Sequence, residues 1–323
     1  MKCFSAMIYA GVFAGMITLT GMQPAYAQEE YSGQWTAEIR PELDDDEIRF
    51  SIYRRSRWGN NSQSSNRMQL TALEGLSQQQ IDSDGARVQF SIIRDAGTLV
   101  CEGWFDDGEG AGSYTYEPNE AYEEALRDLG FRSISDDEQF AMAIQDVSLA
   151  YIEDLVELGY DRLSVDKLIA MKIHGVSRNY IMDLKERGYD RVTSDKLVAM
   201  RIHGVSPEYI DEMRSFGFRR QSTDDLVAMR IHGVRPDFIR EIHALGYERV
   251  SSDKFVAMRI HGVRPDFIKD LKDLGYDRVS LDKLIAMRIH GVTIDYIERV
   301  HDRGFDDISI DDMISMRIHG IMR

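Results

Sequence analysis

Cysteine is scarce in this chain, which has 2 cysteines among its 323 residues. Cys3 falls in the apolar leader described below, so Cys101 would be alone in the exported chain and no intrachain disulfide could form. Cys101 alternates with Leu99 in a strand-like run, a pattern that favours a buried small apolar residue over a reactive thiol. The low cysteine count therefore excludes a fold held by disulfides, and burial of apolar surface must supply the stability.

Long apolar runs are lacking beyond the first 27 residues, so no later segment predicts a transmembrane helix. The leader has a basic start at Lys2, an apolar run over residues 4–22, and Ala25-Tyr26-Ala27, the small-residue pattern that a signal peptidase cleaves. We predict cleavage after Ala27 and export to the periplasm. Retention of the leader as a membrane anchor is the alternative, although three glycines and Pro24 interrupt the run.

Positive charge is in deficit, with 39 Lys and Arg against 55 Asp and Glu and a formal net charge of −16. An acidic exported chain is a poor partner for nucleic acid or anionic lipid, so we expect neither. The chain also lacks a His-Glu-x-x-His zinc motif, a G-x-S-x-G nucleophile turn and a phosphate-binding glycine loop. We therefore predict that the protein is not an enzyme and uses no cofactor or metal.

What the sequence does contain is a repeat of 29 residues, which predicts an array of small stacked units. One landmark is Ile202-His203-Gly204-Val205, whose near-copies recur at the same spacing. Its histidines are His174, His203, His232, His261, His290 and His319. A second landmark is an aromatic residue at Tyr122, Tyr151, Tyr180, Tyr209, Phe238, Phe267 and Tyr296.

Each unit reads as two helices of about ten residues. The first begins after a hydroxyl residue that can accept a hydrogen bond from a first-turn amide, and it ends at the His-Gly pair. These capping residues are Ser135, Ser164, Thr193, Ser222, Ser251, Ser280 and Ser309. The second helix begins at Ser206 and Pro207 in one copy, whereas Arg235 and Arg264 replace the serine in two others.

The first helix of each unit is apolar nearly all round, so we expect it to be covered on more than one side. The second helix carries one apolar stripe. Two such helices cannot bury this surface alone, and the units must therefore stack. We predict an αα-solenoid of about seven repeats over residues 119–323, with self-association through its final repeat as a further expectation.

Before the array, residues 28–118 show a period of two that predicts strands. We expect strands at about residues 35–40, 47–54, 88–94, 98–105 and 111–117, in a small antiparallel sheet or sandwich of five or six strands. Its inner face should include Trp35, Phe50, Phe90 and Trp104. The polar stretch 58–66 predicts a flexible loop, with a binding loop as the alternative, and residues 42–47 predict a solvated turn rather than a calcium site. The fold class is α+β.

The six aligned histidines invite a metal interpretation, but stacked helices lie ~8–10 Å apart, too far for their imidazoles to share one zinc. A histidine before a C-terminal glycine can instead hydrogen-bond the last carbonyls and complement the helix dipole. We predict that structural role. A parallel column of cations, Lys172, Arg201, Arg230, Arg259, Arg288 and Arg317, is predicted either to pair internally with acids such as Asp190, Glu248 and Asp277 or to form a partner-binding ridge.

Ile-His-Gly-Val followed by Pro-Glu-Tyr-Ile resembles a bacterial helical repeat. That repeat occurs in exported proteins and in extracytoplasmic tails of beta-lactam-sensing antirepressor membrane metallopeptidases. The strand segment from Arg94 to Tyr116 resembles the region that often precedes those repeats. The resemblance implies a sensor-like or scaffolding module, and because the zinc motif and membrane helices are missing it implies no peptidase activity here.

These observations favour a non-enzymatic exported scaffold that holds a protein or peptide partner of the cell envelope along its helical array. The alternative is an envelope ligand sensor or signalling accessory, in which the β domain binds a small molecule.

Overall fold

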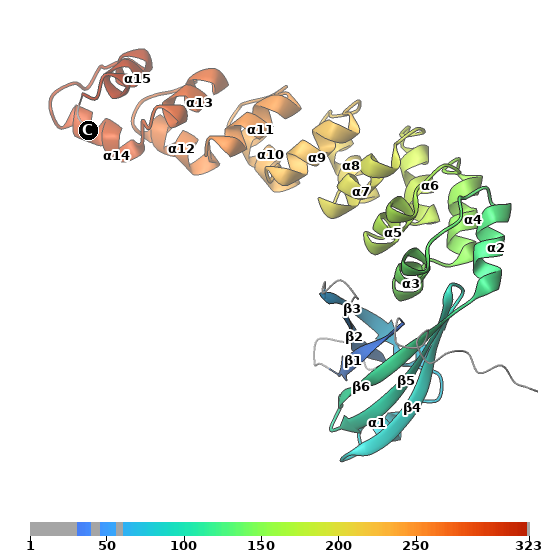
Figure 1. The fold of residues 1–323 in the computed structure, drawn as a ribbon. Helices are drawn as coiled ribbons and strands as arrows, with labels where there is room; N and C mark the ends of the chain where they lie inside the picture. Colours follow the sequence, from blue (N-terminus) through green and yellow to red (C-terminus); the bar gives the residue numbers. More distant parts are fainter. Residues whose placement is uncertain (1–30, 40–45, 56–60, 322–323) are drawn as a thin grey trace, which may run out of the picture. The chain divides into compact units, whose positions relative to one another are not determined.

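The computed structural model describes residues 31–39, 46–55 and 61–321. The predicted leader and its cleavage site, most of the stretch 42–47 and Trp58 lie outside these residues. The chain divides into two compact units, one ending at Asn119 and the other beginning at Glu120. The first is an antiparallel sheet and the second a repeated arrangement of helices, which confirms the predicted α+β fold class (Figure 1).

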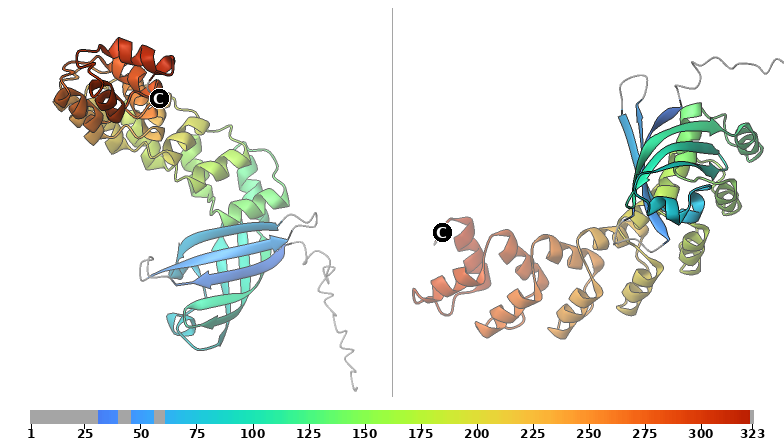
Figure 2. Two further views of the ribbon diagram at one scale, coloured as in Figure 1. Left: turned by 90° about the vertical axis from the view of Figure 1, so that its left-hand side faces the viewer. Right: turned by 90° about the horizontal axis from the view of Figure 1, so that it is seen from below.

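Six strands form one sheet in the order β3-β2-β1-β6-β5-β4, with every neighbouring pair antiparallel (Figure 2, left). The strands are β1 (Ser32–Glu38), β2 (Glu47–Arg55), β3 (Asn61–Gln69), β4 (Ala86–Arg94), β5 (Gly97–Asp106) and β6 (Glu109–Pro118). Five of them lie where the alternating apolar pattern predicted strands. Between β3 and β4 the chain forms a short 3-10 turn, η1 (Leu70–Ala72), and a one-turn helix, α1 (Gln78–Ile81).

The core of this unit is built around Trp35, which is fully buried. Its ring lies 5.2–5.7 Å from the rings of Phe50, Phe90 and Phe105, and its Nε1 donates to the Ser113 carbonyl at 3.1 Å. Three of the four predicted inner residues are therefore confirmed. Cys101 is also buried as predicted, and desolvation raises the pKa of its thiol to about 12, so it is inert at neutral pH.

Trp104 corrects the fourth prediction, because it lies on the opposite face of the sheet with 49% of its surface exposed. Strand β5 places Leu99, Cys101 and Phe105 on the core face, and strict alternation then sends Trp104 outward. Phe105, which follows Trp104 in the sequence, is the aromatic residue of this pair that lies in the core.

Strand β3 corrects the loop predicted for residues 58–66 over residues 61–66, while residues 58–60 lie outside the described ranges. It pairs with β2 from Arg55 opposite Asn61 to Glu47 opposite Gln69. The strand is rich in Ser, Asn and Gln, so it lacks the apolar alternation that identifies a half-buried strand. It forms because it is an edge strand joined to β2 through the backbone, and its side chains need not supply a core.

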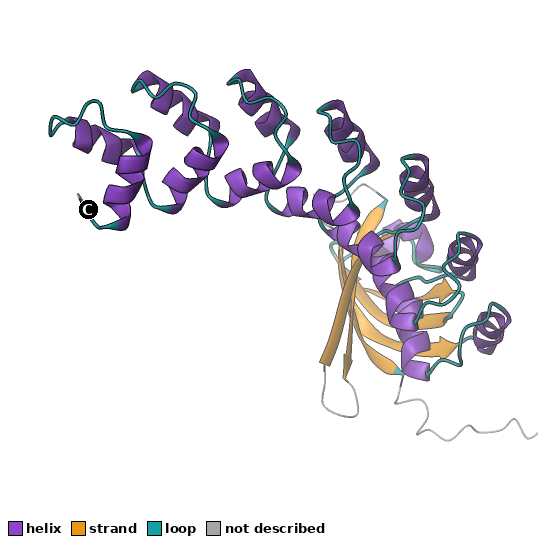
Figure 3. Cartoon of the chain, turned by 90° about the horizontal axis from the view of Figure 1, so that it is seen from above, coloured by secondary structure: helices purple, strands orange, loops and turns teal. Residues whose placement is uncertain are grey.

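In the second unit, 14 helices alternate between two rows (Figure 3). We call the helix that ends at the His-Gly pair, or its equivalent, the A helix, and the other the B helix. The A helices are α3 (Asp136–Ile144), α5 (Val165–Ile173), α7 (Ser194–Ile202), α9 (Thr223–Ile231), α11 (Ser252–Ile260), α13 (Leu281–Ile289) and α15 (Ile310–Ile318). The B helices are α2 (Glu120–Asp128), α4 (Leu149–Glu157), α6 (Arg178–Glu186), α8 (Pro207–Ser215), α10 (Pro236–Ala244), α12 (Pro265–Asp273) and α14 (Ile294–His301).

Each A helix contacts the A helices of the neighbouring units, and most B helices likewise contact B helices. The predicted caps are confirmed: all seven hydroxyl residues accept a hydrogen bond from the amide three residues on. Arg235 and Arg264 make no side-chain cap, also as predicted. Local capping therefore sets where each helix begins, and stacking of like helices buries the surfaces that a single unit would expose.

Candidate interaction surface of the repeat array

The turn after each A helix is held by contacts from the following unit. Gly204 has a left-handed φ of +69°, which a side chain would strain. A Cβ added at Gly204 would also lie 2.7 Å from Nη2 of Arg230. This glycine is thus required both for the exit from the helix and for the approach of the next unit's arginine.

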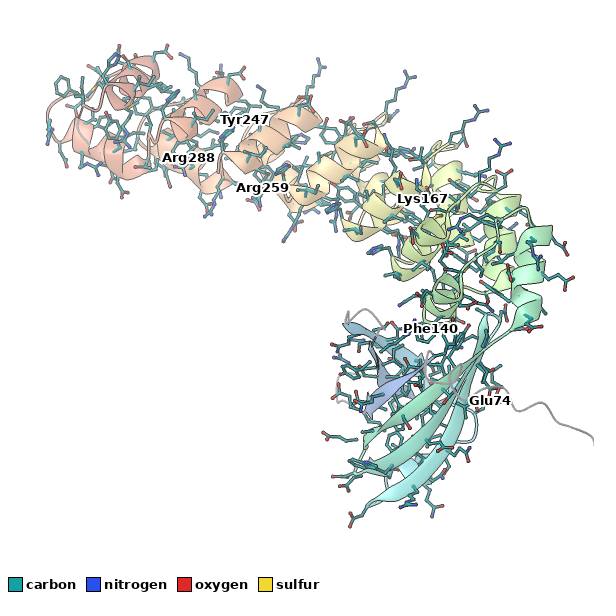
Figure 4. The ribbon with its side chains drawn as sticks, in the orientation of Figure 1. Glu74, Phe140, Lys167, Tyr247, Arg259 and Arg288 are labelled. Carbon is teal, nitrogen blue, oxygen red and sulfur yellow. The ribbon has the colours of Figure 1, made fainter. Side chains whose placement is uncertain are left out.

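The cation column stacks on aromatic rings from the preceding B helices. Arg201 lies 4.9 Å from the ring centroid of Tyr180, and Arg230 lies 4.8 Å from that of Tyr209. The other pairs are Lys172 with Tyr151, Arg259 with Phe238, Arg288 with Phe267 and Arg317 with Tyr296. Arg259 and Arg288 are successive members of this column (Figure 4). Each contact is a cation–π interaction that joins one unit to the next.

Three of these arginines also donate a hydrogen bond to the C-terminal end of the preceding A helix. Nε of Arg201 donates to the His174 carbonyl at 3.1 Å, and Arg230 and Arg259 repeat this bond to His203 and His232. The acids predicted as internal partners do not take part, and Asp190, Glu248 and Asp277 are exposed. Arg201, Arg230 and Arg259 nevertheless remain exposed over part of their surface. The column therefore has one edge engaged in stacking and another facing outward.

The histidines act at the ends of the A helices, mainly through their backbones. The carbonyls of His174, His203 and His232 accept the arginine bonds, and Nδ1 of His319 lies 2.8 Å from the Ser315 carbonyl. No cluster of three or more His, Cys, Asp or Glu suited to a metal occurs within residues 31–39, 46–55 and 61–321. The predicted contact of an imidazole with a last-turn carbonyl therefore occurs at His319, whereas the bonds of His174, His203 and His232 are made by their backbone carbonyls.

Tyrosine hydroxyls tie five of the seven B helices to the turn that follows the next A helix, while α10 and α12 carry Phe238 and Phe267 at this position. Tyr180 Oη donates to the Val205 carbonyl at 2.8 Å, and Tyr209 repeats the bond to Val234. Desolvation raises the pKa of both tyrosines to about 12. A second set of tyrosines lies in the turns after the B helices and also donates to backbone carbonyls. In this set, Tyr189 Oη donates to the Gln221 carbonyl at 3.0 Å. These bonds satisfy carbonyls that would otherwise be unpaired at helix ends.

A ladder of ion pairs joins the first turns of successive A helices. Lys167 pairs with Asp195 and Lys196 with Asp224, each at 2.8 Å, and the pattern returns with Lys254–Asp282 and Lys283–Asp311. Asp225 interrupts it, because it stands where the two units on either side have lysine, and its carboxylate instead accepts from the Ser222 amide at 3.0 Å. The lysines of this edge are thus paired, while the first turns of the A helices carry more acids than lysines, so the edge is net acidic.

The A helices are covered by neighbouring A helices on both sides within the array, as expected, but one apolar residue per unit still points outward. While Leu197 and Met200 are fully buried, Ile202 is 53% exposed. We define the isoleucine row as the last residue of six successive A helices, each 52–57% exposed. Its members are Ile173, Ile202, Ile231, Ile260, Ile289 and Ile318.

The isoleucine row directly follows the cation column in sequence, so an exposed apolar side chain and a partly exposed cation recur together at each A-helix end. Sequence reasoning missed the row because it counted every apolar position of the A helix as core. The signal was present, since Leu197, Met200 and the aromatic of the B helix already fill one face, leaving Ile202 beyond it.

No family model matches this chain, and no curated protein is similar to it at a significant level. No helix within the described ranges is both long and apolar enough to cross a membrane.

Proposed function

We propose that the protein is a non-enzymatic exported scaffold whose helical array binds a polypeptide of the cell envelope along the isoleucine row. The observation that carries this proposal is six isoleucines, one per unit, each more than half exposed at the same position. An exposed apolar patch on a protein surface is costly and commonly marks a binding site, and here an exposed isoleucine recurs at the same position in each of six units. Covering an isoleucine completely contributes ~1.5–3 kcal/mol, so occupying several half-exposed positions together would supply a useful binding energy.

The spacing of the row favours a helical partner. Stacked helices lie ~8–10 Å apart, so the isoleucines recur at about that distance. An α-helix advances ~10.5 Å in seven residues and presents the same face again, whereas alternate residues of a strand recur every ~6.6–6.8 Å. An amphipathic helix with apolar residues at heptad spacing therefore matches successive units.

The charge beside the row defines the partner further. Arg201, Arg230 and Arg259 keep an exposed edge next to the isoleucines, while the Lys–Asp ladder at the other end of the A helices is paired. Acidic side chains flanking the apolar face of the partner would complement this column. The partner is thus an acidic amphipathic helix, and the cation column contributes to binding through its outer edge.

Site-specific photo-crosslinking in envelope fractions tests this proposal. A benzophenone amino acid at Ile231 should give an adduct with a segment that is helical, acidic and amphipathic, and the same group at Met182, an exposed apolar position on B helix α6, should not. Replacing Ile202 and Ile260 with Gln should suppress the Ile231 adduct. Equal adducts from Ile231 and Met182 would contradict the proposal, and an adduct with a second copy would replace it with self-association.

A second candidate function is an envelope ligand sensor in which the β domain binds a small molecule. A groove on the open face of the sheet, lined by Tyr53 and Trp104, favours it.

A further inference from the structure

The open face of the β-sheet carries a cross-strand row that differs from an ordinary solvated face. The register aligns Trp104 with Ala111, Ala111 with Thr36, Thr36 with Ser51, and Ser51 with Ser65. Among these five residues, Trp104 alone has a large side chain. Four small residues on four adjacent strands thus form a low floor beside an indole that is 49% exposed.

A second aromatic residue borders the same floor. Tyr53 on β2 is 39% exposed and lies three strand steps from Trp104 on β5, about 14 Å at the usual strand spacing. Both rings line one groove with a volume of about 510 Å³. A groove of this length, with an aromatic ring at each end, suits a short chain of rings better than a single small ring.

The floor between the two rings offers hydrogen-bonding groups that the sheet leaves unused. Gln34 and Ser113 line an adjoining hollow that shares Thr36, Tyr53 and Trp104 with the groove. The side chains of Gln34, Thr36 and Ser113 have no hydrogen-bond partner among the residues that the structure describes. Tyr53 Oη accepts from Gln63 Nε2 at 3.3 Å, which holds the tyrosine beside the floor. Amides and hydroxyls in this arrangement can both donate to and accept from the hydroxyl groups of a ligand.

The charges in the groove favour a neutral ligand. Nε of Arg49 lies 3.8 Å from a carboxylate oxygen of Glu38, so these two charges offset each other. Glu109 adds a carboxylate to the lining. A carboxylate accepts hydrogen bonds from two neighbouring hydroxyls but repels an anion, so an acidic ligand is disfavoured.

We propose that this groove binds a neutral oligosaccharide between Trp104 and Tyr53. Sugar rings present a face of C–H groups, which packs on the electron-rich face of an aromatic ring, and a rim of hydroxyls, which needs mixed donors and acceptors. The groove has aromatic faces at its ends and such donors and acceptors between them. This site is independent of the polypeptide surface on the array, so the failure of either proposal leaves the other standing.

Isothermal titration of the full chain with three neutral hexasaccharides tests the proposal: β-1,4-linked glucose, β-1,4-linked N-acetylglucosamine and α-1,4-linked glucose. We expect saturable binding of at least one. Trp104→Ala should weaken it at least tenfold, and Ala111→Leu, which fills the floor and keeps both rings, should do the same. Ile93→Ala is the matched control, because Ile93 is an exposed apolar residue of β4 outside the groove.

Three results would overturn the proposal. One is the absence of saturable binding to all three sugars. Another is binding that both Trp104→Ala and Ala111→Leu leave within twofold of the unaltered chain while circular dichroism shows them folded. The third is equal affinity for an oligogalacturonate, whose carboxylates the groove should disfavour. Should Trp104→Ala fail to fold, Ala111→Leu alone decides between these outcomes.

Discussion

At the scale of single residues, the array uses each cation for several contacts at once. Arg230 stacks on Tyr209, donates from Nε to the His203 carbonyl and packs against Gly204, so one side chain joins three elements. The column was recognisable in the sequence as one cation per A helix, but its partners were not. Aromatic rings 21 residues earlier and carbonyls 27 residues earlier become neighbours only when units stack.

We predict that Arg230→Ala lowers the free energy of unfolding by about 1–2 kcal/mol, because it removes a cation–π contact and a hydrogen bond to a helix end. Arg240→Ala is the control, since Arg240 is exposed and pairs only with Asp237 three residues earlier. That variant should change stability by less than about 0.5 kcal/mol. Urea unfolding followed by circular dichroism measures both, and equal effects would show that the stacking contributes nothing.

The buried tyrosines predict a loss of stability at alkaline pH. Burial raises the pKa of Tyr180 and Tyr209 to about 12, whereas an unfolded tyrosine titrates near ~10. The unfolded chain therefore loses its phenolic protons first, so stability is complete below about pH 10 and declines as the pH rises toward 12. Urea midpoints at pH 8, 10 and 11 measure this decline, which Tyr180→Phe should reduce. A midpoint that is constant through pH 11 would contradict the burial argument.

At the scale of elements, helix boundaries were predictable because caps are local. The capping hydroxyl residue, the amide from which it accepts a hydrogen bond and the terminal glycine all lie within one unit. The seven A helices begin where those residues indicate. The outward orientation of Trp104 follows from the period of two once Leu99 and Cys101 are placed inside. The outward orientation of Ile202 does not follow from the helical period alone, because an apolar residue at the margin of a helix pattern fits either side and its orientation depends on which neighbours fill the core.

The interrupted ladder allows a test at the contact between two A helices. Asp225→Lys on α9 should form the missing pair with Asp253 on α11 and stabilise the chain by less than about 1 kcal/mol, since the pair is exposed and the bond to the Ser222 amide is lost. The gain should disappear in 1 M salt, where the screening length is about 3 Å. Asp225→Asn isolates the relief of repulsion, and a gain from Asn equal to that from Lys would argue against a new ion pair.

At the scale of the whole molecule, the stability of the array is the sum of the stabilities of its units and of the contacts between them. Deleting residues 193–221, one complete unit, brings like helices together and should leave a soluble helical protein of somewhat lower stability. Deleting only residues 206–221 removes B helix α8 and uncovers its neighbours, a loss of several kcal/mol at ~25 cal/mol per Å² of apolar surface. Thermal melts compare the two deletions, and identical melts would contradict the stacked arrangement.

The central claim is that the isoleucine row is a binding surface and not part of the core. Its residues are half exposed, so replacing Ile202, Ile231 and Ile260 with Gln, a good helix former, should cost about 1 kcal/mol or less at each site. The decisive measurement is the dissociation constant of this triple variant for the helical segment identified by crosslinking at Ile231. We predict a folded protein whose affinity is at least tenfold weaker than that of the unaltered chain. A folded triple variant with unchanged affinity, or one that no longer folds, would contradict the claim.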